Sequence, residues 1–500
     1  MRGYHEALQK LAELSSNRSV TALFEPSASP SPSRRASPRD LNAQALPEVL
    51  AWLRRAGYSP QDLARMRHIH VAGTKGKGSV CAFATAMLAK YRTVGTYTSP
   101  HLVSPRERIA IDGVPVRQED FAEAFFEVWD RLTAAARAEG MAAAEAEGAA
   151  SKPFFFRFMT ILAWHIFLKR GVRDVVMEVG IGGEFDDTNV LPGEAVSAAV
   201  VTQLGVDHVA MLGDTVEEIS WHKAGIFKPG VRAFTLKMDN QPSVMEVLRE
   251  RAAEKGTELV ELDRRRIEEW GGVVGGSLQG DFQKKNQALA VAAVREHLGM
   301  QNQQHDGGAM MGILEDIPAK MIEGLREANL RGRCEIVQDA EHEVTWLLDG
   351  AHTTDSLAEV AKWAVSSIER DERMILLYNQ QERDAAELLA GFLEAVGRAS
   401  NRADVFCYAV LTRNEIERLE GMGATRDVEV QKRSADRMIH ETARCGAPIS
   451  ASILDNLGDA IAEARRVSRS SDGRRQKILV TGSLHLVGGV LQILEPEALL

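Results

Sequence analysis

The residues best suited to chemistry lie in a glycine-rich stretch, HVAGTKGKGS, at positions 70–79. Its glycines would let several backbone N–H groups turn toward one point, and Lys77 would offset the charge of a phosphate. The spacing departs from the Walker pattern, since Val71 stands where the first glycine belongs. We interpret the stretch as a variant phosphate-binding loop; a glycine turn with a solvated lysine is the alternative. The residues expected to contact nucleotide are Lys75, Gly76, Lys77, Gly78 and Ser79.

The segments around this stretch follow the order that a phosphate-binding loop requires. A short strand is expected at 68–73 and a helix at 79–91, on either side of the glycines. The pattern then repeats, with a helix expected at 158–171, a buried strand at 174–180 and a further strand at 195–205. Strands that alternate with helices predict an α/β fold with a largely parallel sheet.

Three other segments are expected to be irregular or exposed. The stretch from Ser27 to Asp40 is rich in Ser, Pro and Arg, which predicts a mobile loop. Residues 301–312 are expected to form a second loop. The run from Ala134 to Ala150 is rich in Ala and Glu and predicts the extension of a helix on the surface.

The length of 500 residues exceeds what one compact core usually holds, so two domains are expected. The strand and helix pattern restarts near Arg331. We therefore predict two domains, 1–330 and 331–500. The first is expected to be a P-loop ATPase-like domain with a parallel sheet, and the second a smaller Rossmann-like α/β domain.

Composition excludes several classes of protein. The formal net charge is −10 and no basic tract dominates, which argues against a nucleic-acid partner. No stretch reaches the length of a membrane span, and the N-terminus has no hydrophobic signal core. The 4 cysteines lie far apart without a CxxC pair, which is typical of a reducing compartment. We expect a cytoplasmic protein, with a mitochondrial form as the alternative.

Six further blocks of sequence carry more information than composition does. Those before residue 300 are TSPHLVSPRERI (98–109), MEVGIGGEFDDTNV (177–190) and LGVDHVAMLGDTVEEISWHKAGIFKPG (204–230). Those after it are LRGR (330–333), LLDGAHT (347–353) and LVTGSLHLVG (479–488). In order and spacing, these blocks and the glycine-rich loop resemble the folylpolyglutamate synthase family of the Mur ligase superfamily.

The resemblance implies an ATP-dependent amide ligase. Such enzymes join L-glutamate to the γ-carboxylate of tetrahydrofolyl polyglutamates through an acyl phosphate, with ADP and phosphate as products. The implied cofactors are ATP and Mg²⁺, with a monovalent cation such as K⁺ as a further candidate. The chain is expected to act as a monomer, without a nucleic-acid or membrane partner.

The resemblance also assigns roles to single residues. Ser99, Glu178 and His208 match magnesium ligands, and carboxylate, hydroxyl and imidazole groups suit that metal. Lys223 matches a lysine that carries a carbamate in related enzymes. Taken alone, Glu178 could be a helix-capping partner, His208 an ordinary surface histidine and Lys223 a surface lysine.

Three residues of the second half are implied to act on nucleotide or substrate. Arg333 and Asp349 match residues that reach the nucleotide, and His352 could touch substrate. The expected catalytic set is Lys77, Lys223 and His352. An interdomain salt bridge is the alternative role of Arg333 and Asp349.

Two departures from the family pattern bear on substrate and adenine contacts. Glu184 stands where the family often has Arg or a small residue, so local substrate contacts are expected to differ. Phe282 replaces a histidine in DFQKKNQALAV, which leaves Gln283 and Asn286 as candidate adenine contacts.

Three rival functions remain open. The nearest is a dihydrofolate synthase, which adds the first glutamate to dihydropteroate; Lys75, where many dual-activity bacterial relatives have Asn, favours the polyglutamate enzyme. A nucleotide-dependent switch is the second, although its strand would usually end in Asp and not in Glu178. An inactive scaffold is the third.

Overall fold

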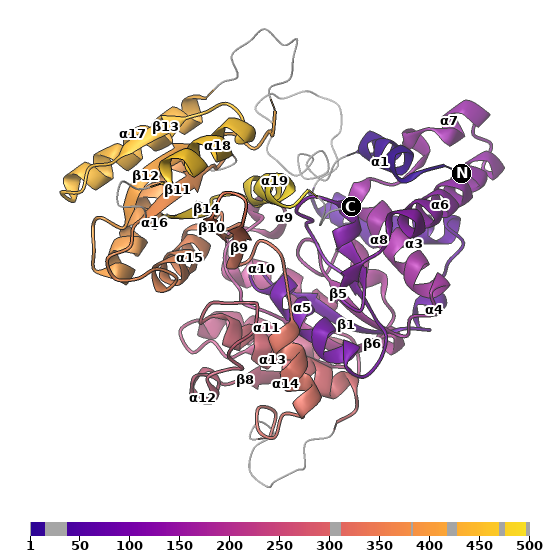
Figure 1. The fold of residues 1–500 in the computed structure, drawn as a ribbon. Coiled ribbons are helices and arrows are strands. Elements are labelled where there is room, and N and C mark those ends of the chain that lie inside the picture. The colour runs from indigo at the N-terminus through magenta and orange to yellow at the C-terminus, as the bar shows by residue number, and fades with distance from the viewer. Residues whose placement is uncertain are drawn as a thin grey trace. The chain divides into compact units, whose positions relative to one another are not determined.

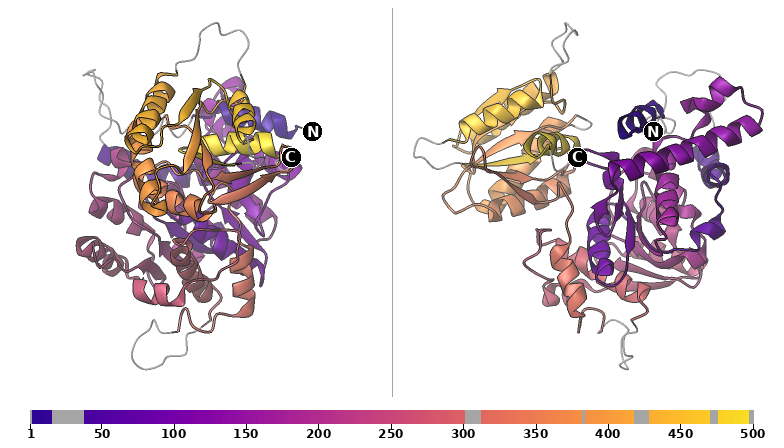
Figure 2. Two further views of the ribbon diagram at one scale, coloured as in Figure 1. Left: turned by 60° about the vertical axis from the view of Figure 1, so that its left-hand side comes forward. Right: turned by 45° about the vertical axis from the view of Figure 1, so that its right-hand side comes forward.

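The computed structural model describes residues 2–15, 38–300, 312–381, 384–417, 428–469 and 476–496. Contacts between residues divide the chain into two compact units (Figures 1 and 2). Unit 1 comprises residues 1–101, 105–276 and 284–328, and unit 2 comprises residues 102–104, 277–283 and 329–500. These contacts do not show which part of the chain folds on its own. The division into the domains 1–330 and 331–500 therefore stays a prediction.

Unit 1 is built on an eight-stranded sheet whose central strands are parallel. In sheet order the strands are β4 (Val114–Pro115), β3 (Ile109–Ile111), β2 (Val94–Tyr97), β5 (Asp174–Glu178), β1 (Arg67–Ala72), β6 (Val196–Val201), β7 (Arg232–Leu236) and β8 (Glu258–Leu262). The pairs β2–β3 and β3–β4 are antiparallel, and the other pairs are parallel. The strand before the glycine-rich loop, β1, therefore lies between β5 and β6, and all three end at the same edge.

Helices cover both faces of this sheet. They are α1 (Tyr4–Glu13), α3 (Pro38–Arg55), α4 (Pro60–Leu63), α5 (Lys77–Ala89), α6 (Gln118–Ala138), α7 (Ala143–Glu147), α8 (Phe155–Lys169), α9 (Val209–Leu212), α10 (Val216–Lys223), α11 (Pro242–Lys255), α12 (Arg264–Trp270), α13 (Gln283–His297) and α14 (Ala319–Glu327). The largest apolar cluster packs α1, α3, α6 and α8 against one face, with Trp129, Trp164 and Phe158 fully buried. A second cluster packs α11 and the short turn that follows α10 (Ala224–Ile226) against the β6–β7 region.

Unit 2 has a six-stranded sheet that is parallel except for one edge pair. In sheet order the strands are β13 (Ser450–Ile453), β12 (Phe406–Leu411), β11 (Met374–Tyr378), β14 (Lys477–Thr481), β10 (Val344–Leu348) and β9 (Glu335–Asp339), with β9 antiparallel to β10. The helices are α15 (Thr354–Ser366), α16 (Ala385–Ser400), α17 (Glu429–Arg444), α18 (Leu457–Val467) and α19 (Leu484–Leu494). One apolar cluster joins α15, α16 and α17 to the sheet, and another joins α18 and α19 to it. The expected α/β fold with parallel sheets is confirmed in both units.

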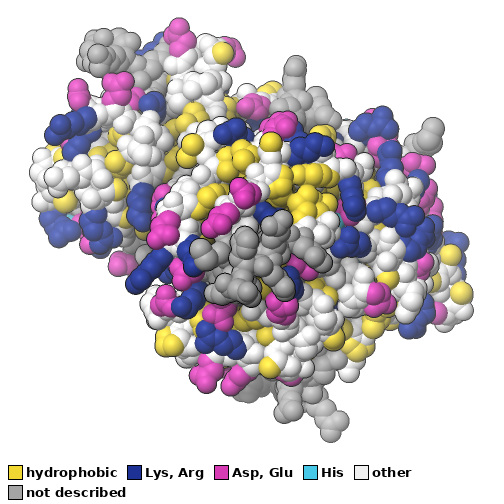
Figure 3. Space-filling model, turned by 90° about the horizontal axis from the view of Figure 1, so that it is seen from below, with side chains coloured by type: hydrophobic (Ala, Val, Ile, Leu, Met, Phe, Trp, Pro, Cys, Tyr) yellow, Lys and Arg dark blue, Asp and Glu magenta, His cyan; other side chains and the backbone are white. Residues whose placement is uncertain are grey.

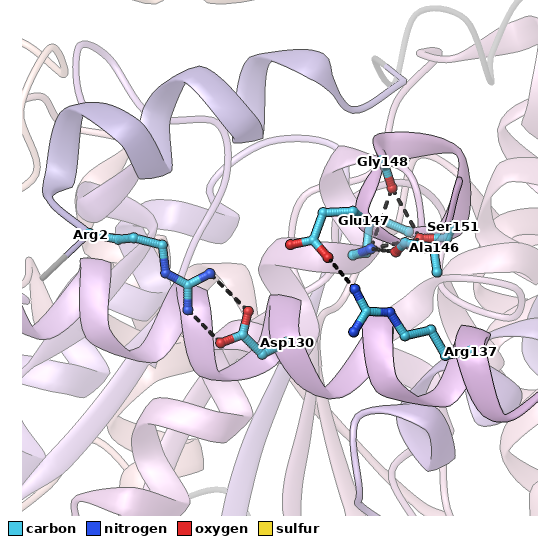
Figure 4. Close-up of polar contacts among 8 residues, drawn as sticks. Arg2, Asp130, Arg137, Ala146, Glu147, Gly148 and Ser151 are labelled. Atoms are coloured by element: carbon cyan, nitrogen blue, oxygen red, sulfur yellow. Dashed lines mark hydrogen bonds and ion pairs between the residues drawn. The ribbon is translucent and has the colours of Figure 1, made fainter. Parts of the chain in front are cut away.

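The run 134–150 is not the single surface helix that its composition predicts. The α6 helix ends before Gly140, whose φ of +91° is one that glycine adopts without strain. The separate helix α7 follows, joined to α6 by an ion pair of 2.9 Å between Arg137 and Glu147 (Figure 4). Ala146 of α7 is fully buried, so this helix is part of the packing.

Two segments expected to be loops are described only in part by the structure. Pro38 to Asp40, predicted to end the loop 27–40, form the first turn of α3, where proline is well tolerated. The rest of that loop and residues 301–311 lie outside the described residues.

Two surface properties complete the fold. Among the residues that the structure describes, no helix is long and apolar enough to cross a membrane. Basic and acidic side chains are interspersed over the face seen in Figure 3.

Candidate functional site

The glycine-rich loop of unit 1 connects β1 directly to the N-terminus of α5. Gly73 has a φ of +146° and Gly76, which caps α5, a φ of +87°, conformations that L side chains rarely adopt. A Cβ atom at Gly73 would collide with the side chain of Thr202, and one at Gly76 with that of Asn286. Backbone geometry and space both require glycine here. The α5 helix begins at Lys77, two residues earlier than predicted.

Two of the predicted site residues meet where β1 and β5 end. Val71 of β1 is in register with Glu178, the last residue of β5. The carboxylate of Glu178 lies 3.9 Å from the ammonium nitrogen of Lys77, and the side chains are 4% and 17% exposed. Glu178 also accepts a hydrogen bond of 3.1 Å from the backbone N–H of Ser99. Lys77, Glu178 and Ser99 are therefore neighbours, and their roles at the site stay predictions.

His208 lies in a partly exposed turn between β6 and α10. The β6 strand ends at Val201, and His208 caps α9 with a φ of +51°. Its imidazole is 43% exposed and lies 3.8 Å from the carboxylate of Asp207. Within the described part of the chain, no group of three or more His, Cys, Asp or Glu side chains could hold a metal ion. The predicted set Ser99, Glu178 and His208 includes a serine hydroxyl, which is outside that group of side chains, and it stays a prediction.

Lys223 is not a surface lysine. The residue is 2% exposed, and its ammonium nitrogen donates a hydrogen bond of 2.9 Å to the backbone carbonyl of Gly73. Burial and the positive charge of Lys77 lower the pKa of Lys223 to about 7, and Asp207 and Asp186 partly oppose the shift. Burial therefore favours the neutral amine of Lys223 more than it would be favoured in an exposed lysine.

Asp186 organises the turn that follows Glu178. One carboxylate oxygen accepts the N–H groups of Gly180 and Ile181, each at 3.0 Å, and the other accepts the N–H and hydroxyl of Thr188. Burial raises the pKa of Asp186, and these hydrogen bonds oppose the shift. Sequence reasoning did not single out Asp186, although an acidic residue between a double glycine and a Thr-Asn pair is a recognisable turn signal.

Glu184 is held by ion pairs within unit 1, and the altered substrate contacts expected at this position stay a prediction. Its carboxylate forms ion pairs with Arg251 and Lys255 of α11. The guanidinium of Arg251 also lies 4.2 Å from the ring centre of Trp221 on α10. The ion pairs join the loop after β5 to α11, and the contact between Arg251 and the Trp221 ring joins α11 to α10.

In unit 2, three predicted residues gather at the end of β10. The buried carboxylate of Asp349 accepts the N–H groups of Cys334 (2.8 Å) and Ala351 (2.9 Å). Burial raises the pKa of Asp349, and the charge of Arg333 is the largest opposing influence. The Nδ1 of His352 donates to the carbonyl of Gly350 at 3.1 Å. Asp349 thus holds the turn that presents Arg333 and His352.

Fold and site together define a class of protein, an α/β protein with a glycine-rich loop at the end of a central parallel strand. Residues 332–493 match the family model described as "Dihydrofolate synthetase, C-terminal domain". The chain is 37% identical over 477 residues to folylpolyglutamate synthase of Neurospora crassa, covering 91% of this chain and 86% of that protein. It is 36% identical over 480 residues to folylpolyglutamate synthase of Saccharomyces cerevisiae, covering 91% of this chain and 82% of that protein.

A solved structure agrees with these relatives. Folylpolyglutamate synthase of Mycobacterium tuberculosis, crystallised with ADP and AMPPCP, has a TM-score of 0.66 at 25% identity, covering 91% of this chain and 99% of that chain. The chain belongs to the folylpolyglutamate synthase family and is an ATP-dependent ligase. The resemblance inferred from the seven sequence blocks is confirmed.

Proposed function

We propose that this enzyme adds L-glutamate to the γ-carboxylate of tetrahydrofolyl polyglutamates. A carboxylate oxygen of the folate attacks the γ-phosphorus of ATP, the bond to ADP breaks, and an acyl phosphate forms. The amine nitrogen of glutamate then attacks the acyl carbon and loses a proton while phosphate leaves. The observation that carries the proposal is the meeting of the glycine loop, Lys77 and Glu178 at the end of the central strands. The names of the relatives support the choice of folate and glutamate.

The glycine loop has the properties that binding of the ATP phosphates needs. The residues proposed to contact ATP are Lys75, Gly76, Lys77, Gly78 and Ser79. Gly76 and the first turn of α5 offer backbone N–H groups and the positive end of the helix dipole. The ammonium of Lys77 would offset the charge that develops on the transferred phosphoryl group.

Ser99, Glu178 and His208 are the proposed ligands of Mg²⁺. Their hydroxyl, carboxylate and imidazole groups fit a hard divalent ion, and the buried carboxylate of Glu178 supplies the anionic oxygen. A bound Mg²⁺ would draw charge from the phosphate oxygens of ATP. The resemblance adds a monovalent cation such as K⁺ as a further candidate.

Lys223 is proposed to carry a carbamate. A neutral amine adds CO₂ and releases a proton, and burial favours the neutral form of Lys223. The resulting anion would replace a cation close to the glycine loop. Mass spectrometry of the native protein tests this proposal, because fully active protein without the added CO₂ would contradict it.

In unit 2, Arg333 and Asp349 are proposed to act on nucleotide and His352 on substrate. The planar fork of an arginine guanidinium suits bidentate contact with phosphate. We further propose a monomeric cytoplasmic enzyme, with a mitochondrial form as the alternative.

One assay tests the substrate. Purified protein is incubated with ATP, Mg²⁺, L-glutamate and either tetrahydrofolate or dihydropteroate, and the products are read by mass. Products of tetrahydrofolate that grow by single glutamates support the proposal. Use of dihydropteroate without extension of tetrahydrofolate would mean that the enzyme is a dihydrofolate synthase. The name of the family model that residues 332–493 match makes this the alternative to test.

A further inference from the structure

The glycine loop is supported by the segment that follows β6. The backbone N–H groups of Thr74 and Lys75 both donate to the carbonyl of Gln203, at 2.9 and 3.1 Å. The hydroxyl of Thr74 donates to the carbonyl of Gly205 at 3.0 Å. The loop is therefore joined to this segment along most of its length.

Thr202 contacts the glycine loop through both its backbone and its buried side chain. The residue is 1% exposed, and its backbone N–H donates to the carbonyl of Ala72 at 2.8 Å. Its hydroxyl donates to the carbonyl of Lys75 at 2.7 Å. The same hydroxyl occupies the space next to Gly73 where a Cβ atom would otherwise lie. A single side chain thus fills the concave side of the turn and binds its carbonyl.

This hydrogen bond also sets the direction of an N–H group. The carbonyl of Lys75 and the N–H of Gly76 belong to one planar trans peptide, so they point in opposite directions. When Thr202 holds the carbonyl on the side of β6, the N–H of Gly76 is aimed away from it. Rotation of that peptide would turn the N–H away from its place beside the first turn of α5.

We propose that Thr202 is a positioning residue that orients the Lys75–Gly76 peptide for binding of the ATP phosphates. The inference rests on the proposed role of the glycine loop. Thr202 itself contacts neither nucleotide nor folate in this proposal and acts through the loop. Its effect should therefore appear in nucleotide binding more than in the binding of glutamate.

The test compares Thr202→Val with Thr202→Ser and a matched control, Thr235→Val. Valine keeps the shape of threonine and removes the hydroxyl, whereas serine keeps the hydroxyl. Thr235 lies on the neighbouring strand β7 and is also fully buried, but its hydroxyl has no hydrogen-bond partner in the described structure. The control therefore removes a buried hydroxyl that orients nothing.

The readouts are the Kd for ADP and for a non-hydrolysable ATP analogue by calorimetry, the KM values and kcat, and the unfolding temperature. Thr202→Val should weaken nucleotide binding and raise the KM for ATP by about tenfold, the loss expected for one hydrogen bond in a preorganised site. The KM for glutamate should not change. Thr202→Ser should recover most of the affinity, and Thr235→Val should match the parent.

Two outcomes overturn the proposal: nucleotide affinity of Thr202→Val within about twofold of the parent, or a loss that serine does not restore. If the valine variant does not fold, Thr202→Ala, which also lacks the hydroxyl, is judged by the same criteria. Failure of the proposed function looks different, because the parent would then bind no nucleotide or form no glutamylated product.

Discussion

Lys77 is held more tightly than a solvated lysine in a glycine turn, which was the alternative interpretation, would be. It opens α5, is 17% exposed and lies 3.9 Å from the buried carboxylate of Glu178. Lys77→Ala should lower kcat/KM by about 10³, the size of effect seen when a preorganised charge is removed. It should also lower the unfolding temperature slightly, since Glu178 would lose its neighbouring positive charge.

Lys90, at the other end of the same helix, is the matched control for this change. Its ammonium pairs with Glu323 and Glu327 of α14 at the surface. Lys90→Ala should keep full activity in steady-state assays of both variants. Activity of Lys77→Ala within a few-fold of Lys90→Ala would end the phosphate-loop assignment.

The proposed metal ligands give a second prediction at this scale. Glu178→Gln and His208→Ala should each shift the dependence of rate on Mg²⁺ to higher concentration, because each removes a ligand without emptying a core. His440→Ala, an exposed histidine on α17, should leave the curve unchanged. If the variants of Glu178 and His208 keep the parent's curve, the metal site lies elsewhere.

The sequence could predict which residues are candidates for the site, but it could not predict their burial or their hydrogen bonds. Lys77, Glu178 and Asp349 stand in recognisable blocks at strand ends, and the structure places each beside a turn or loop. The burial of Lys223 could not be read from a short helix whose other residues are mostly polar. Thr202 belongs to no recognisable motif. Its role depends on which strand lies beside β1, and a local stretch of sequence does not show that.

At the scale of elements, β1 carries two buried histidines that make the stability of the folded protein depend on pH. His68 and His70 are both fully buried. Burial is the main cause that lowers the pKa of His68 to about 4 and that of His70 well below its usual range. The unfolded histidine binds a proton below its ordinary pKa of about 6.5, so each residue reduces stability as pH falls from there.

Other buried groups act in the opposite direction over the same window. Burial raises the pKa of Asp187 to about 7, so the folded state binds its proton first and acidification favours folding. The contribution of His68 is therefore obtained by comparing the free energy of unfolding of the parent with that of His68→Gln. Between pH 6.5 and 4, the free energy of unfolding of the parent should fall more steeply than that of His68→Gln, by up to about 1.4 kcal/mol per pH unit.

Denaturant unfolding at several pH values measures this difference. His342→Gln, a partly exposed histidine on the β9–β10 hairpin, is the control. Parallel pH curves for the parent and His68→Gln would contradict the assigned burial of His68.

Element types were easier to predict than their boundaries. The alternation of apolar strands and helices predicts both parallel sheets, because a strand buried on two faces must read as a continuous apolar run. The break between α6 and α7 depends on one glycine, Gly140, within a run whose composition otherwise favours helix. The start of α3 at Pro38 was missed because Ser, Pro and Arg dominate the preceding residues.

At the scale of the whole molecule, the chemistry of a ligase links the use of ATP to the presence of its other substrates. An acyl phosphate exposed to water hydrolyses, so turnover should depend on the presence of the acceptor amine. This requirement distinguishes a ligase from a nucleotide-dependent switch, which would hydrolyse ATP without either substrate.

The last prediction follows from that requirement. Release of phosphate from ATP should be slow with enzyme and Mg²⁺ alone, and tetrahydrofolate and L-glutamate together should raise it by at least tenfold. Each phosphate released should match one glutamate added, because both come from the same acyl phosphate. Dihydropteroate in place of tetrahydrofolate should stimulate poorly, since the accepted carboxylate already belongs to a glutamate. Phosphate release that ignores both substrates would favour the switch, and equal stimulation by dihydropteroate would mean that the site does not require an existing glutamate.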